Sequence, residues 1–423
     1  MSRGAGNEGP RLCRHDNARG SAYSAAPDFA SAWILMQHPL LDAALRHLER
    51  LIAFDTVSSR SNLALIGYLE EVLTAAGIPF RRLPDAGGEK ANLLAFLGSV
   101  ERPGIVLSGH TDVVPVAGQN WSSDPFRAVL RDGCLYGRGS ADMKGFLACM
   151  LTIAEAAASH SLPRPLILAF SYDEEVGCKG VPVLIEALQA CAAPPLGCVV
   201  GEPTGMRIAD AHKGKIGLRC TVRGREAHSG LPQLGANAIF AAAELIAWIA
   251  REAERLAAEG PYAEGFDPSF TTANVGVVEG GSQLNIVPNR CSFLCEFRTL
   301  PGEQPEACAQ RLKAHAETVV LPRLRARAPE ATITFETIMA YPGLQADLDT
   351  PFGRLCRRLA EPGPPVKLSF GTEAGHFARA GIPALVCGPG DIACAHKPDE
   401  HVALDQLERC LGFLDILVRQ ELQ

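Results

Sequence analysis

The chain has no surplus of positive charge, since 40 lysines and arginines stand against 47 aspartates and glutamates over 423 residues. Acidic and basic residues are interspersed, so no basic face is available for a polyanion to dock on. Glycine-rich segments such as GRGS and GPGD match neither the G-x-G-x-x-G pattern nor the Walker pattern. We therefore expect no nucleic-acid partner and no phosphate-binding loop.

A long apolar run is also missing. The longest candidate, Ala236–Ala250, contains Asn237 and Glu244 and falls short of the roughly 18 residues that indicate a membrane span. We expect a buried helix there and no membrane partner.

Paired cysteine motifs are absent as well. The 14 cysteines include no CxxC pair and lie in apolar segments such as LACML and ALVCGPG. This distribution is typical of reduced thiols in a core, not of a disulfide scaffold. We expect a reducing compartment, and thus a cytoplasmic protein.

The N-terminal segment, residues 1–37, has several arginines among small residues but lacks the apolar stretch of a secretory signal. Two explanations stay open. The segment is either a disordered tail or an overlong start, because Met36 directly precedes the first helical pattern.

What the chain does have is an alternation of short apolar runs with longer helical patterns. The runs are LLAFLG, GIVLSG, PLILAFS, GCVVGE and PALVCG. Such alternation predicts an α/β fold with a mostly parallel sheet and helices on both faces.

The pattern changes between residues 214 and 337, where the order becomes strand, helix, strand, strand, helix, strand. That order is typical of a ferredoxin-like α+β domain. We therefore expect an inserted dimerisation or lid domain over residues 214–337, dividing a catalytic domain into segments 38–213 and 338–423.

Acidic and imidazole side chains follow the predicted strands, at the sheet edge where parallel strands present their ligands. They are His110 and Asp112 after GIVLSG, Glu174 and Glu175 after PLILAFS, Glu202 after GCVV, His396 after PALVC, and Asp142, which opens a helix after GRGSA. Each alone has an ordinary explanation, such as a helix N-cap for the aspartate. Together they predict one site.

The charge of this set favours two cations over one. Asp142, Glu175 and Glu202 would repel one another in a shared cleft, and two divalent cations leave only a slight positive excess. Mixed imidazole and carboxylate ligands suit zinc, although cobalt or manganese can use the same ligands.

The motifs SGHTDVVP, LYGRGSADMKG, SYDEEVG, GEPT, GREAHSG and CAHKPDE resemble those of the co-catalytic zinc aminoacylase and carboxypeptidase family, and the resemblance runs from about His38 to the C-terminus. The resemblance implies two Zn²⁺ ions, with Co²⁺ as a possible substitute. It assigns His110 and Glu202 to one ion, Glu175 and His396 to the other, and Asp142 as the bridge.

The resemblance further implies that Glu174 is the general base of amide hydrolysis and that the Asp142–Met143 peptide bond is cis. His228 would reach the site of a partner subunit to stabilise the oxyanion, so a homodimer is expected. Asp112, two residues after His110, is placed to accept the second ring proton of that histidine. The alternative interpretation of Asp112 is an ordinary turn residue.

Within the family, SFGTEAGHF over Ser369–Phe377 resembles acetylornithine deacetylases. LNIVP and FRTLPG suggest Asn285 and Arg298 as anchors for a substrate carboxylate, with a strand-edge salt bridge as the alternative for Arg298. Glu373 is the candidate partner of the substrate ammonium, in competition with Asp391, Glu400 and a purely structural role.

The expected reaction is hydrolysis of a small N-acyl amino acid, N2-acetyl-L-ornithine to L-ornithine and acetate, a step of arginine biosynthesis. The alternatives are a succinyl-diaminopimelate desuccinylase, another aminoacylase or a dipeptidase. A noncatalytic paralogue that binds metal or ligand is the alternative from another class. It requires a missing base or ligand, whereas every expected position is filled.

Overall fold

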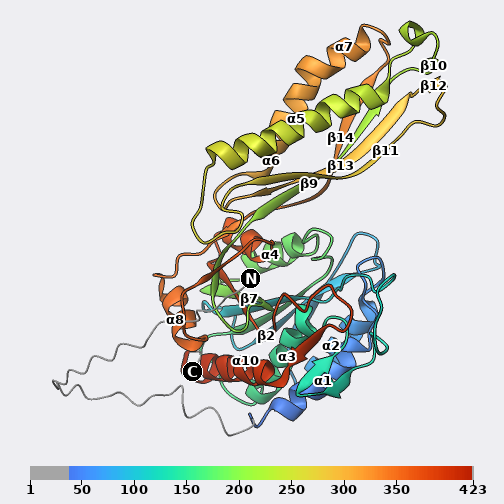
Figure 1. Ribbon diagram of the computed structural model, residues 1–423. Helices are drawn as coiled ribbons and strands as arrows, with labels where there is room; N and C mark the ends of the chain where they lie inside the picture. The colour runs from blue at the N-terminus through green and yellow to red at the C-terminus, as the bar shows by residue number, and fades with distance from the viewer. Residues whose placement is uncertain (1–37, 422–423) are drawn as a thin grey trace, which may run out of the picture. The chain divides into compact units, whose positions relative to one another are not determined.

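The computed structural model describes residues 38–421, so the expectation for residues 1–37 lies outside the described residues. A nine-stranded sheet organises the larger part of the described chain (Figure 1). Its strands are β1 (Phe80–Pro84), β2 (Ala91–Leu97), β3 (Ile105–His110), β6 (Leu166–Ser171), β7 (Gly197–Pro203), β8 (Ala209–His212), β15 (Leu344–Gln345), β16 (Val366–Leu368) and β17 (Ala384–Gly388).

The strand order is β1-β2-β6-β3-β7-β17-β8-β15, and β16 pairs with β8. The central strands β6, β3, β7 and β17 are parallel to one another. On one side β2 joins β6 antiparallel, and on the other β8 joins β17 antiparallel. The predicted mostly parallel sheet is thus confirmed, and its antiparallel flanks are an addition that the sequence pattern did not predict.

Side chains of the central strands alternate between two cores, one on each face of the sheet. Leu107 of β3 lies in one core and Val106 in the other. Because both faces are buried, these strands have continuous apolar sequences. The first core includes residues of α1 (Leu41–Ile52), α2 (Leu63–Ala75), α3 (Gly145–Ala157), α8 (Pro351–Leu359) and α10 (Leu404–Ile416), and the second includes residues of α4 (Val181–Gln189) and α9 (Ala374–Arg379).

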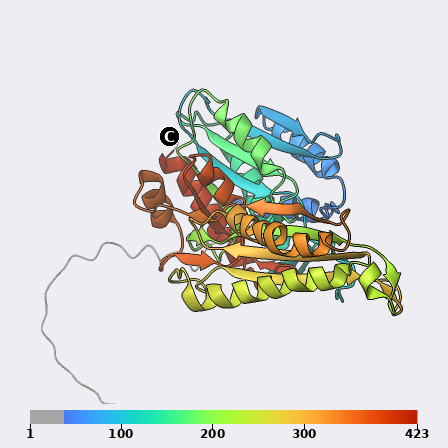
Figure 2. The same ribbon diagram turned by 90° about the horizontal axis from the view of Figure 1, so that it is seen from above.

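A separate four-stranded antiparallel sheet has the order β11-β13-β9-β14. Its elements follow in the predicted order as β9 (Gly214–Arg223), α5 (Ala238–Glu259), β11 (Thr272–Gly280), β13 (Arg290–Thr299), α6 (Pro305–His315), α7 (Leu321–Arg325) and β14 (Thr332–Tyr341). A third core joins the sheet to α5 and α6, and Figure 2 shows α5 running along its strands. Strand β14 ends at Tyr341, four residues beyond the predicted end of the inserted domain at residue 337. The domain boundaries remain a prediction.

Two small sheets bring distant segments together. β4 (Val129–Arg131), β5 (Cys134–Tyr136) and β18 (His401–Ala403) form one, and β10 (Ala227–His228) pairs with β12 (Ile286–Val287) in the other. No helix within residues 38–421 has the length and apolar character needed to cross a membrane. Every cysteine in that part of the chain is free.

Candidate metal centre

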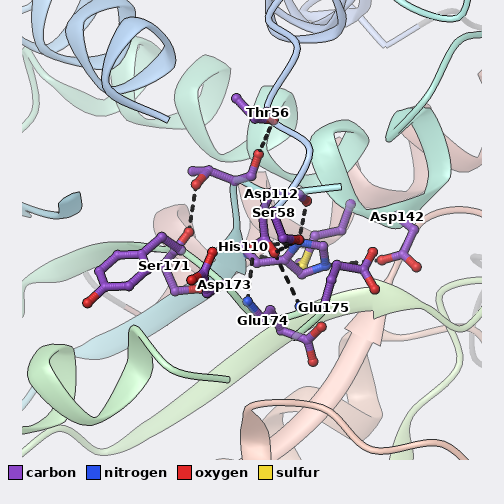
Figure 3. A network of polar contacts seen from close by, with 12 residues as sticks. Thr56, Ser58, His110, Asp112, Asp142, Ser171, Asp173, Glu174 and Glu175 are labelled. Atoms are coloured by element: carbon purple, nitrogen blue, oxygen red, sulfur yellow. Dashed lines mark hydrogen bonds and ion pairs between the residues drawn. The ribbon is translucent and has the colours of Figure 1, made fainter. Parts of the chain in front are cut away.

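Three neighbouring parallel strands deliver acidic and imidazole groups to one edge of the large sheet. His110 is the last residue of β3, Glu174 and Glu175 follow the end of β6, and Glu202 lies near the end of β7. Since β6, β3 and β7 are adjacent, their carboxyl ends meet. Figure 3 shows His110, Asp142 and Glu175 close together, with Glu174 beside them.

The imidazole of His110 is fully buried. Its Nδ1 donates to the backbone carbonyl of Asp112 at 2.8 Å, so Nε2 is the nitrogen available to a cation. That Nε2 lies 3.1 Å from Asp142 Oδ1 and 3.6 Å from Glu202 Oε1. The ring therefore directs Nε2 at a group of carboxylates, where a cation would replace the proton on that nitrogen.

The carboxylate of Asp112 has a different role from the one predicted. It lies 3.7 Å from His110 Nδ1, too far for a hydrogen bond, and the backbone carbonyl takes the ring proton instead. The carboxylate oxygens accept from the backbone N–H groups of Glu174 at 3.0 Å and Glu175 at 3.3 Å, and from Ser58 Oγ at 2.7 Å. Asp112 thus fixes the backbone of the glutamate pair.

Asp142 lies between the two imidazoles. Its Oδ1 faces His110 Nε2 and its Oδ2 faces His396 Nε2, each at 3.1 Å. The Asp142–Met143 peptide bond is cis, which confirms that prediction. Asp142 does not open a regular helix, because its φ of −122° and ψ of 90° are non-helical and α3 begins at Gly145.

His396 contacts both carboxylates of the second predicted metal position. Its Nε2 lies 3.1 Å from Glu175 Oε2, in addition to its contact with Asp142. The side chain is 50% exposed, whereas His110, Asp142 and Glu202 are buried, so His396 is the most accessible of the predicted ligands.

Two groups of side chains, which share His110, could each hold a cation. Within each group the potential ligand atoms lie within 4.8 Å of one another. One consists of His110, Glu174 and Glu202, and the other of His110, Asp142 and Glu175. Imidazole nitrogen and carboxylate oxygen form a donor set that zinc accepts, and cobalt can replace it. The residues therefore fit the divalent cations that the sequence predicted.

The electrostatics of the cluster also favour positive charge. Burial and neighbouring carboxylates raise the pKa of Glu175 to about 7 and hold the pKa values of Glu174 and Glu202 well above the usual range. Despite burial, the hydrogen bond to Asp142 and the charges of Glu202 and Glu174 raise the pKa of His110 well above its usual value. A cluster that binds protons this strongly is short of cationic charge, which divalent ions supply.

A buried ion pair supports the turn that carries Asp142, and the sequence interpretation missed its role. Arg138 Nη1 donates to Glu400 Oε2 at 2.6 Å, and each side chain is 1% exposed. Glu400 Oε1 accepts from the N–H groups of Ala141 and Asp142, both at 3.0 Å. The sequence offers Glu400 only as a candidate partner of the substrate ammonium. No local sequence pattern links Glu400 to Arg138. The pairing of β18 with β5 brings the two residues close together.

Both carboxylate oxygens of Glu373 are engaged by serine hydroxyls, so the structure does not support its expected contact with a substrate ammonium. The residue is fully buried. One carboxylate oxygen accepts from Ser108 Oγ and the other accepts from Ser171 Oγ at 2.7 Å. Glu373 instead joins β3 and β6 just before the ligand-bearing ends, which is the structural role left open by the sequence.

The remaining candidates lie on the four-stranded sheet and its loops. His228 and Asn285 are exposed neighbours, since the carbonyl of Asn285 accepts from Ser229 N at 3.0 Å and His228 pairs with Ile286. Arg298 Nε donates to Glu296 Oε1 at 3.0 Å, the salt bridge that was the alternative for this residue. The side chain of Arg298 is 33% exposed.

Comparison with known proteins gives consistent matches. The model of the peptidase family M20/M25/M40 matches residues 106–420. The chain is 38% identical to an acetylornithine deacetylase of Myxococcus xanthus over 88% of this chain and 96% of that protein, and 31% identical to one of Pasteurella multocida over 89% and 97%. An M20 family metallo-carboxypeptidase from Sulfolobus solfataricus shares the fold with a TM-score of 0.70 at 17% identity, over 89% of this chain and 98% of that one.

Proposed function

Because the chain belongs to the M20/M25/M40 peptidase family, we propose that it is a metal-dependent amidohydrolase that converts N2-acetyl-L-ornithine to L-ornithine and acetate. The observation that carries the chemistry is the buried cluster of carboxylates and imidazoles at the ends of β3, β6 and β7. The choice of substrate is supported by the 38% identity to an acetylornithine deacetylase over nearly the whole of both chains.

The two carboxylate oxygens of Asp142 support the proposed division of the ligands between two cations. Each of its oxygens meets a different imidazole, which suits a bridge between two cations. We assign His110 and Glu202 to one cation and Glu175 and His396 to the other. When bound, two zinc ions would polarise the amide carbonyl and make water a better nucleophile at neutral pH.

Glu174 is assigned as the general base. Its carboxylate lies within the cluster, where it can take a proton from water and return it. Glu174 removes a proton from the attacking water and returns it to the nitrogen of the leaving ornithine. Asp112 holds the backbone N–H of Glu174, and Cys178 Sγ lies 3.5 Å from its Oε1, so the base is fixed in position.

The substrate carboxylate is assigned to Arg298 and Asn285, and the oxyanion to His228 of a second copy of the chain. Arg298 is half of an ion pair with Glu296 but remains partly exposed, and its planar fork suits a carboxylate. His228 is exposed on β10, where another subunit can bring it to a neighbouring site. A homodimer follows from this assignment.

We further propose that the enzyme acts in arginine biosynthesis in the cytoplasm. The free cysteines of residues 38–421 suit a reducing compartment. The pathway is proposed from the product, L-ornithine, of the proposed reaction.

A substrate panel tests the proposal directly. Protein reconstituted with zinc is offered acetylornithine, an acetylated amino acid with an apolar side chain, N-succinyl-diaminopimelate and a dipeptide. We expect the highest kcat/KM for acetylornithine and no turnover after chelation. A higher kcat/KM for one of the other compounds would reassign the substrate, and turnover by metal-free protein would exclude the metal chemistry.

A further inference from the structure

The side chain of Gln119 connects two segments that carry proposed ligands. Its Nε2 donates to the backbone carbonyl of His396 at 2.9 Å. Its Oε1 accepts from Trp121 Nε1 at 3.0 Å and from Arg138 Nη2. Arginine and indole N–H groups are donors only, so the amide has a single orientation that satisfies all three contacts.

The same contacts continue to Asp142. Arg138 binds Gln119 with one nitrogen and Glu400 with the other, and Glu400 accepts from the backbone N–H of Asp142 at 3.0 Å. Arg138 also lies over the ring of Trp121, 4.9 Å from its centroid. A continuous polar chain thus joins the backbone of the bridging aspartate to that of His396.

His396 is the ligand that needs outside support most. Its side chain is 50% exposed, and its φ of 60° lies in the left-handed region that non-glycine residues rarely adopt. Such a conformation persists only when surrounding contacts hold it. Within the described part of the chain, the other hydrogen bonds between residues 116–127 and residues 391–399 run from the N–H and Oγ of Ser122 to Asp399 Oδ1, both at 2.9 Å. Asp399 lies three residues beyond His396.

From this geometry we propose that Gln119 is a positioning residue for the cation held by His396. It fixes the His396 backbone relative to Asp142, so that the imidazole meets Asp142 and Glu175 at binding distance. This inference rests on the two-cation centre proposed above. Groups that orient metal ligands typically change metal affinity ~10- to 100-fold when removed, and we expect a loss in that range for one of the two cations.

Two substitutions separate the hydrogen bond from charge and size. Gln119→Glu keeps the acceptor for Arg138 and Trp121 but replaces the donor to His396 with a carboxylate oxygen. Gln119→Met removes all three contacts without adding charge. Gln189→Glu is the matched control. Gln189 is the last residue of α4, and its Nε2 also donates to a backbone carbonyl, that of Ala380 at 3.3 Å.

The measurement is Co²⁺ binding to metal-free protein, followed by visible absorption and by competition with a chelator, with thermal unfolding to show that each variant is folded. We expect the wild type and Gln189→Glu to bind two equivalents with the same affinities. Both Gln119 variants should bind one equivalent normally and the second ~10- to 100-fold more weakly. Excess Co²⁺ should restore their absorption spectrum.

Two results would overturn the inference. Folded Gln119→Glu and Gln119→Met variants with wild-type affinity for both equivalents would do so and leave the proposed function intact. A wild-type chain that binds at most one equivalent would remove the two-cation centre, and the inference with it.

Discussion

One carboxylate oxygen of Asp112 accepts a hydrogen bond from the backbone N–H of Glu174 at 3.0 Å, and the other accepts from Glu175 N–H at 3.3 Å. Two consecutive peptide groups are thus fixed by one side chain. Because the backbone of both residues is held, the side chains of Glu174 and Glu175 keep different neighbours and can have different roles. Glu175 contacts His396, whereas Glu174 contacts Cys178.

Substitution of the two glutamates should give opposite results. Glu174→Gln should keep two bound metals and lose at least the ~10²- to 10⁴-fold in kcat that general acid–base catalysis contributes. Glu175→Gln should lose metal, because an amide is a poor substitute for a carboxylate that contacts His396. Elemental analysis beside steady-state kinetics measures both. If Glu174→Gln loses the metal instead, the roles within the pair are reversed.

Asp112→Asn should lower kcat by ~10- to 100-fold, the usual effect of losing a group that orients the site. The new NH₂ would face a backbone N–H of the glutamate pair, donor against donor. Ser58→Ala is the control, since it removes a 2.7 Å donor to the same carboxylate and leaves both backbone hydrogen bonds. Equal losses in the two variants would show that the backbone bonds are not the important ones.

The sequence predicted the ligand-bearing strand ends because a parallel sheet buried on both faces has continuous apolar strands, and ligands follow directly after them. His110, Glu174 and Glu202 were found in this way. The signal weakens where a contact depends on side-chain direction. The alternation of a strand does not tell whether the backbone carbonyl or the carboxylate of Asp112 accepts from His110. In the structure the carbonyl accepts this hydrogen bond, and the carboxylate lies 3.7 Å away.

Contacts between residues far apart in the sequence were not predicted either. Glu373 is 265 residues from Ser108 and 202 from Ser171, and Glu400 is 262 from Arg138. A buried carboxylate that accepts from two serines looks in the sequence like any acidic residue near a motif. Only the strand order, which places β3 beside β6, reveals its partners.

Removing the Glu373 carboxylate should affect stability more than specificity. Glu373→Ala removes the acceptor of the buried Ser108 and Ser171 hydroxyls, at a cost of ~1–3 kcal/mol for each unsatisfied buried group. Glu373→Gln should be milder, since a serine hydroxyl can also accept. Chemical denaturation measures the difference.

A kinetic comparison separates this role from recognition of the substrate ammonium. If Glu373 acts through the strands, Glu373→Gln should change KM by the same factor for acetylornithine and for an acetylated amino acid with an uncharged side chain. A selective rise in KM for acetylornithine would return Glu373 to the substrate site.

Arg298→Lys should raise KM for acetylornithine with little change in metal content. A point charge does not reproduce the bidentate fork that suits a carboxylate. Glu296→Gln is the companion variant, because it leaves the guanidinium untouched while it weakens both ion pairs of Glu296, that with Arg298 at 3.0 Å and that with Lys215 at 2.7 Å. An unchanged KM in Arg298→Lys, together with reduced stability of that variant, would favour the salt bridge as the purpose of Arg298.

His228 should act on the site of a partner subunit. Losing one oxyanion donor typically costs ~10²- to 10³-fold in kcat, so His228→Ala should be nearly inactive with its metals intact. Glu174→Ala should also be nearly inactive. In a mixed dimer, the subunit with His228→Ala keeps its own Glu174 and receives an intact His228 from its partner. One of the two sites is then complete.

Unfolding and refolding the two variants together in equal amounts tests this arrangement. Random pairing makes about half of the dimers mixed, and each mixed dimer has one working site of two, so the mixture should recover roughly a quarter of wild-type activity. Each variant refolded alone is the control and should recover none. Mass spectrometry that shows mixed dimers without any recovered activity would place His228 in its own chain's site, because a histidine acting within one chain cannot complement a base missing from the other.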